Sequence, residues 1–99
     1  MIHVVAIITT KPGKRAEFLT AYRANIPAVR AEAGCIEYGP AIDVSFSPTP
    51  LGDDTFAVIG KWESEDHLKA HMAAPHMPAF WATTKDWVES RTVHFLRAP

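Results

Sequence analysis

The sequence predicts an α+β protein of the ferredoxin-like type, in which the elements follow one another as β-α-β-β-α-β and the four strands form one antiparallel sheet. Two observations lead to this prediction. Runs of β-branched or alternating residues near both ends and in the middle of the chain predict strands. Apolar residues at helical spacing predict helices in the two long intervals between them. The 99 residues leave room for one hydrophobic core, so we expect a single domain over residues 1–99.

The first two elements are predicted to be a strand and a helix. Residues 2–10 are rich in β-branched residues and end at a Lys-Pro-Gly turn, which predicts a strand. Residues 14–33 predict a helix that ends at Gly34 and is kinked or broken at Pro27. The apolar stripe of this helix consists of Phe18, Tyr22, Ile26 and Val29.

The middle of the chain is predicted to form two strands joined by a loop. Residues 35–46 alternate, which predicts a half-buried strand with a bulge near Gly39 and Pro40. Its apolar face consists of Ile36, Tyr38, Ile42, Val44 and Phe46. Residues 47–54 are rich in proline and form the expected loop, and residues 55–63 predict the next strand.

The last part of the chain is predicted to contain a helix in two pieces and a closing strand. Ser64 is placed as the N-cap of a helix that runs to about Ala74 and is stopped by Pro75. A second helical piece is expected over residues 78–87, and residues 91–97 predict the final strand.

Two of the predicted strands are apolar on both faces. In the first strand one face carries Ile2, Val4, Ala6 and Ile8, and the other carries Val5 and Ile7. In the third strand, Phe56, Val58 and Trp62 alternate with Ala57 and Ile59. Such strands require cover on both sides of the sheet, and the chain has no spare helix to supply it. We therefore expect a homodimer whose sheets pack face to face as a dimeric α+β barrel.

Net charge, cysteine content and the N-terminal residues indicate which partners and which cellular compartment to expect. The formal net charge of -1 offers no basic patch for nucleic acid. Cys35 is the only cysteine, which fits a reducing compartment. The N-terminal residues resemble no signal peptide, and their apolar run is too short to span a bilayer, so we expect no membrane association and a cytoplasmic location.

Three histidines lie close together in the sequence HLKAHMAAPHMPAFW (residues 67–81). His67 and His71 are four residues apart on a helix, and His76 follows a proline that could turn it back toward them. Zinc usually takes three or four ligands with a carboxylate or thiolate among them, and neither Glu63 nor Cys35 is well placed to complete a set. We therefore predict no metal site.

Acid-base chemistry is the second interpretation of this segment. His71 borders the apolar stripe of its helix, where an imidazole can take a proton from a phenolic hydroxyl, and His76 could join it at the mouth of a pocket. The alternative is that both histidines only cap helix ends or bind backbone groups.

An aromatic cavity is the third feature that the sequence suggests. Side chains that could line it are Tyr22, Trp62, Met72, Met77, Phe80, Trp81 and Trp87. Residues of these types more often form the core, which is our expectation for Phe18, Phe56 and Trp87. A flat apolar cleft with one or two polar groups suits a small aromatic ligand.

The segment KWESEDHLKAHMAAPHMPAFW (residues 61–81) closely resembles the antibiotic biosynthesis monooxygenase family, the quinol-monooxygenase-like proteins of the dimeric α+β barrel fold. Members commonly show a Trp-Glu pair at a strand end, an Ala-His helix, a Pro-His break and an aromatic helix. The corresponding residues here are Trp62-Glu63, Ala70-His71, Pro75-His76 and Phe80. The sequences KPGKRAEF and AEAGCIEY also resemble the family, so the resemblance covers essentially the whole chain.

This resemblance implies a homodimer without metal, flavin or haem that oxidises a small phenol or quinol with molecular oxygen. It places His71 as the base, with His76, Tyr22 or Trp62 orienting the substrate. The haem-degrading branch of the fold uses Asn, Trp and His at positions that here hold Ala6, His71 and Trp81, so the resemblance does not extend to haem degradation. The alternatives are a protein that binds or senses an aromatic metabolite or quinone without turnover, and an isomerase of the same fold.

Overall fold

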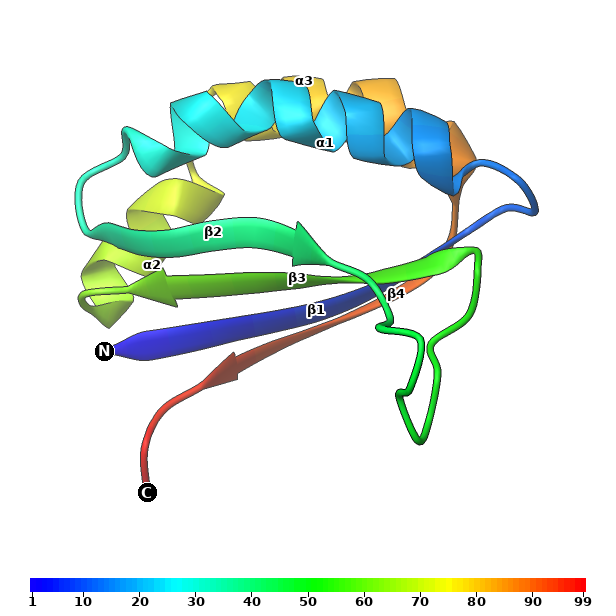
Figure 1. Ribbon diagram of the computed structural model, residues 1–99. Coiled ribbons are helices and arrows are strands. Elements are labelled where there is room, and N and C mark those ends of the chain that lie inside the picture. Colours follow the sequence, from blue (N-terminus) through cyan, green and yellow to red (C-terminus); the bar gives the residue numbers. More distant parts are fainter.

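The computed structural model describes all 99 residues and shows a four-stranded sheet with helices on one face (Figure 1). The elements are β1 (Ile2–Thr10), α1 (Arg15–Arg30), β2 (Cys35–Ala41), β3 (Thr55–Trp62), α2 (Glu65–Met72), α3 (His76–Thr84), the short 3₁₀ helix η1 (Lys85–Trp87) and β4 (Val88–Leu96). The strand order is β2-β3-β1-β4, and all neighbouring strands are antiparallel. The predicted ferredoxin-like α+β fold is therefore confirmed.

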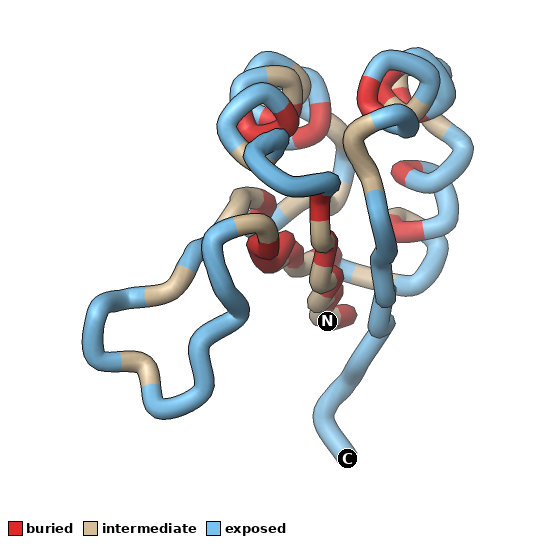
Figure 2. Tube along the Cα trace, turned by 90° about the vertical axis from the view of Figure 1, so that its right-hand side faces the viewer, coloured by how far each residue is buried: buried red, intermediate tan, exposed pale blue.

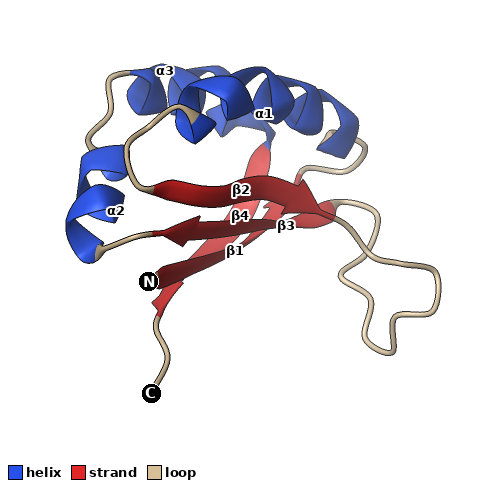
Figure 3. Cartoon of the chain, turned by 60° about the vertical axis from the view of Figure 1, so that its left-hand side comes forward, coloured by secondary structure: helices blue, strands red, loops and turns tan.

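The helices cover only part of the sheet. Helices α1 and α3 lie side by side over one face, and α2 lies at the end of the sheet where β3 finishes (Figures 1 and 3). The core lies between these layers, where α1 buries Phe18, Leu19, Tyr22 and Val29 against the alternate residues of β1. Strand β4 is exposed from Glu89 onward (Figure 2). The space between the helices and the sheet is therefore open on the side of β4, and this opening leads to the candidate site.

Two local signals in the sequence have the structural role that was predicted for them. Gly34 follows α1 with a φ of +81°, and a Cβ atom there would lie 2.3 Å from the ring of His67. Only glycine meets both conditions without strain. Ser64 caps α2, because its hydroxyl accepts a hydrogen bond of 3.2 Å from the backbone N–H of His67.

The predicted break at Pro27 is wrong, since α1 continues without interruption from Arg15 to Arg30. Pro27 lies in the last turn, where its missing N–H removes only one hydrogen bond. Its carbonyl still accepts a hydrogen bond of 3.1 Å from Ala31.

The strand predicted over residues 35–46 is too long, because β2 ends at Ala41. Pairing stops where Ala41 meets Ala57 of β3, and the chain then leaves the sheet as a loop. Its apolar residues Ile42, Val44 and Phe46 are exposed. The irregularity in pairing lies between Cys35 and Glu37, and not at Gly39 and Pro40 as predicted. Pro40 pairs with Val58 on an edge strand, where the absence of a proline N–H breaks no ladder.

The other boundaries differ by a few residues. The second helical piece begins at His76 and not at residue 78, and its last residues are the 3₁₀ turn η1. Strand β4 begins at Val88, three residues earlier than the predicted 91. None of the helices combines the length and the apolar character that crossing a bilayer requires.

Candidate active site

A cavity of about 500 Å³ lies between the sheet and the helices, next to the uncovered side of β4. Fourteen of its seventeen lining residues are hydrophobic, and they come from β1, β2, β3, β4, α1, α2 and α3. The residues predicted for the cavity that do line it are Tyr22, Trp62, His71, Met72, Met77, Phe80 and Trp81, whereas Trp87 does not line it. His76 does not line this cavity, although it belongs to the same cluster of side chains as His71. Such a cavity matches the size and composition of sites for small aromatic molecules.

Glu32 joins the two histidines of the predicted site. Its carboxylate lies 2.9 Å from Nδ1 of His71 and 3.2 Å from Nε2 of His76. Glu32 follows α1, whereas the histidines lie on α2 and α3. An ionised carboxylate can only accept hydrogen bonds, so both ring nitrogens donate to it.

The hydrogen bond to Glu32 determines which nitrogen of His71 is available for chemistry. With Nδ1 donating, Nε2 of the neutral ring carries a free lone pair, because the ring's hydrogen bonds to the protein are all made by Nδ1. The ring lines the cavity and is only 5% exposed. It is also stacked on Trp62, with 4.5 Å between the ring centroids. His71 is therefore held in one orientation and one tautomer, as a general base requires.

His76 has a different environment. Its Nδ1 lies 3.2 Å from Oδ1 of Asn25, so both of its ring nitrogens face acceptors. These two contacts fix the orientation of the His76 ring. His76 therefore supports the Glu32–His71 pair from outside the cavity.

Two stacked tyrosines form another polar feature of the cavity wall. The rings of Tyr22 and Tyr38 are 5.4 Å apart, and both residues are buried. Burial raises the pKa of the Tyr22 phenol above its ordinary value, and the neighbouring Tyr38 adds to the effect. Burial likewise raises the pKa of Tyr38. The Tyr22 hydroxyl is buried and interacts with the Tyr38 side chain, so it is a protonated group on the cavity wall that a bound ligand could use.

A cation also reaches the cavity from the open strand. Arg91 of β4 places its guanidinium carbon 4.2 Å from the centre of the Trp81 ring, and both residues line the cavity. This cation–π contact holds a positive charge beside an apolar space. The polar groups of the cavity wall therefore include an imidazole, two phenols and a guanidinium.

Glu32, His71 and His76 contact one another through direct hydrogen bonds. No three His, Cys, Asp or Glu side chains are grouped in a way that could hold a metal ion. Cys35, considered above as a ligand, is half-buried and free. Its thiol pKa is raised by burial and, to a lesser extent, by the charge of Glu32.

Sequence reasoning missed four residues of this site: Asn25, Glu32, Tyr38 and Arg91. Tyr38 lies on the predicted apolar face of its strand, and that signal could have indicated a place in the wall. Glu32 had no such signal, because 39 residues separate it from His71. Arg91 lies in a strand that the helices leave uncovered, which no local pattern reveals.

The chain is an α+β protein with a ferredoxin-like sheet and an aromatic cavity, and His71 of the partly buried Glu32–His71 pair lies on the wall of this cavity. The family model for antibiotic biosynthesis monooxygenase matches residues 1–83. The Escherichia coli (strain K12) protein named "Probable quinol monooxygenase YgiN" is 35% identical over 103 residues, covering 98% of this chain and 97% of that protein. The chain therefore belongs to the antibiotic biosynthesis monooxygenase family.

Solved structures show the same fold. A conserved protein from Methanosarcina mazei Go1 superposes with a TM-score of 0.86 at 22% identity, covering 99% of this chain and 92% of that one. A structure described as an antibiotic biosynthesis monooxygenase superposes with a TM-score of 0.81 at 24% identity, covering 100% of this chain and 99% of that one. At these identities the likeness concerns the fold alone.

Proposed function

We propose that this protein is a cofactor-independent monooxygenase that oxidises a small phenol or quinol with molecular oxygen. Family membership and the name of the Escherichia coli relative support this class of reaction. The observation that carries the proposal is the His71 ring on the cavity wall, with Nδ1 bound by Glu32 and Nε2 free.

His71 acts as the base. Its Nε2 takes the proton from the substrate hydroxyl, and Glu32 stabilises the imidazolium that forms. The resulting phenolate is electron-rich and reduces oxygen directly. One oxygen atom is added to a ring carbon and the other leaves as water, so that a phenol and O₂ give a quinone and water.

The remaining groups bind and orient the ring. The Tyr22 hydroxyl donates a hydrogen bond to a substrate oxygen, and Arg91 stabilises negative charge as it develops. Trp62, Phe80 and Trp81 enclose the aromatic ring, and Met72 adapts to its substituents. This apolar lining limits the access of water to the reacting atoms.

Oxygen uptake with a panel of phenols and hydroquinones tests the proposal. We expect turnover by the wild type and at least a hundredfold loss in His71→Ala. His67→Ala is the matched control, since His67 lies on the same helix but not on the cavity. Equal rates in wild type and His71→Ala would contradict the role of His71. Saturable quenching of tryptophan fluorescence without oxygen uptake would instead indicate a binding or sensing protein, and an isomeric product would indicate an isomerase.

We also propose that the protein is a homodimer formed through the open face of the sheet. The centre of that face consists of Val5, Ile7 and Ile59, which come from β1 and β3, are only partly buried and face away from the helices. No helix covers this face of the sheet (Figure 1). A second sheet would remove this apolar surface from water.

A further inference from the structure

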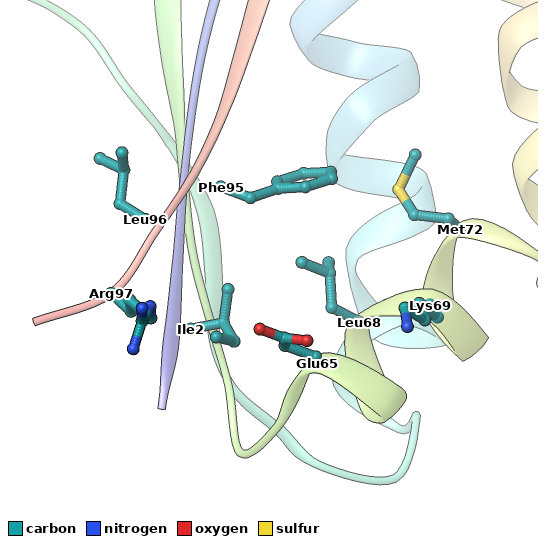
Figure 4. Close-up of a pocket in the computed structure, with 8 residues that line it drawn as sticks. All are labelled: Ile2, Glu65, Leu68, Lys69, Met72, Phe95, Leu96 and Arg97. Atoms are coloured by element: carbon teal, nitrogen blue, oxygen red, sulfur yellow. The ribbon is translucent and has the colours of Figure 1, made fainter.

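A second cavity, of about 440 Å³, adjoins the first one at the end of the sheet where β1 begins and β4 ends. Three side chains, Leu68, Met72 and Phe95, line both cavities. In Figure 4, Phe95 reaches from β4 toward Met72 on α2, with Leu68 beneath them. We call the new space the outer cavity and the one beside His71 the inner cavity.

The three shared side chains form an adaptable partition. Met72 and Phe95 are each 52% exposed, and neither is locked in the core. A methionine has three rotatable bonds and moves at little energetic cost. A flexible chain attached to a ring in the inner cavity can therefore pass between Met72 and Phe95 into the outer cavity.

The outer cavity is apolar inside and charged at its rim. Ile2, Leu68 and Phe95 contribute apolar side chains, whereas the Leu96 side chain points away from them (Figure 4). Lys69 and Arg97 bring two positive charges to the rim, and Glu65 brings one negative charge. None of these three belongs to an ion pair within the protein. The rim therefore has a net positive charge available to a ligand.

We propose that the substrate is a phenol or hydroquinone whose ring carries an aliphatic chain ending in a carboxylate. The ring occupies the inner cavity, the chain crosses the partition, and the carboxylate is bound by Lys69 and Arg97. The placement of the ring rests on the proposed function. The assignment of the outer cavity rests on its own lining and charge.

Calorimetric titration with phenols in the absence of oxygen, where no turnover is possible, tests this assignment. The probes are 4-ethylphenol, the 4-hydroxyphenyl alkanoic acids with three to eight chain carbons, and their methyl esters. We expect the affinity to rise by about threefold for each methylene that enters the outer cavity. We expect each long acid to bind about fivefold more tightly than its ester.

Variants of the rim residues distinguish the binding of the carboxylate chain from the binding of the ring. In Lys69→Gln and Arg97→Gln the preference for acid over ester should be lost, whereas binding of 4-ethylphenol should not change. Lys11→Gln, with the same charge change at the opposite end of β1, should behave as wild type. Met72→Trp, which fills the partition, should weaken the long acids at least tenfold more than it weakens 4-ethylphenol.

The two proposals fail in different ways. If chain length and charge have no effect on affinity, the outer cavity does not bind substrate, whether it is empty or filled by a partner subunit, and the inference is overturned. That result leaves oxygen uptake with simple quinols as an independent test of the reaction. If the long acids bind as expected but no probe quinol is oxidised, the inference stands and the monooxygenase proposal fails.

Discussion

The Glu32 carboxylate lies 2.9 Å from Nδ1 of His71, in a contact that is largely shielded from solvent. Because His71 lies on the cavity wall and Glu32 behind it, the acid orients the imidazole without touching a ligand. A carboxylate in this place can hold a histidine as a base, and in the proposed mechanism Glu32 is a positioning residue.

Replacement of Glu32 by Gln should lower kcat by about tenfold to a hundredfold with little change in KM. The amide can donate to Nδ1 and so favour the tautomer whose Nε2 is already protonated. The measurement is oxygen uptake over a range of pH, and the pH profile of the variant should differ from that of the wild type. Glu37→Gln is the matched control, since Glu37 forms an exposed ion pair with Lys61. A purely structural role would lower thermal stability and leave the pH profile unchanged.

Alkaline pH should destabilise the protein through its two tyrosines. Burial raises the pKa of Tyr22 and of Tyr38 in the folded state above the value of 10.0 for a free phenol. Above pH 10 the unfolded chain therefore ionises first, and the free energy of unfolding falls by up to about 1.4 kcal/mol per pH unit for each tyrosine. Urea unfolding at several alkaline pH values measures the slope.

The control for the tyrosine prediction is a Phe variant. Tyr22→Phe should have a smaller alkaline slope than the wild type, in a Cys35→Ala background that removes the thiol. An unchanged slope would mean that the Tyr22 phenol does not resist ionisation.

Trp62→Ala should destabilise the protein by about 3–5 kcal/mol, because it removes a large buried ring. Trp62 is 1% exposed and supports His71 by stacking. Trp81→Ala is the comparison. Because Trp81 is only partly buried, its replacement should lower the free energy of unfolding by less. Urea midpoints measure both changes, and equal losses would contradict the assignment of Trp62 to the core.

Ser64→Ala should lower the free energy of unfolding by about 1 kcal/mol, because the N-cap of α2 loses its hydrogen bond. Ser45→Ala, in the exposed loop after β2, should have no measurable effect. If the two variants are equally stable, the cap contributes nothing.

Val5→Asp should prevent dimer formation, since it would bury a charge at the centre of the proposed sheet-to-sheet contact. Sedimentation velocity at micromolar concentration should show a dimer for wild type and a monomer for the variant. Ala24→Asp, on the exposed surface of α1, should remain a dimer. A folded wild-type monomer at this concentration would contradict the proposal.

Much of the fold could be predicted because its signals are local. Gly34, in the turn between α1 and β2, has the positive φ that its place in the sequence predicts. Ser64 caps α2, as its sequence context also predicts. Alternating and helical patterns give the order of elements, because the period of apolar residues reports the secondary structure directly. The boundary errors, such as the strand that ends at Ala41, arise because pairing depends on a neighbouring strand that the local pattern does not contain.

By itself, the sequence determined the sheet, the helices and the supply of aromatic residues, since these depend on neighbours within a few positions. Only the tertiary structure brought Glu32 against His71 and His76, which lie 39 and 44 residues away. It also decided that β4 stays uncovered and that Arg91 reaches the cavity. Local periodicity carries no record of such distances, whereas the packing of α1, α2 and α3 on the sheet sets them.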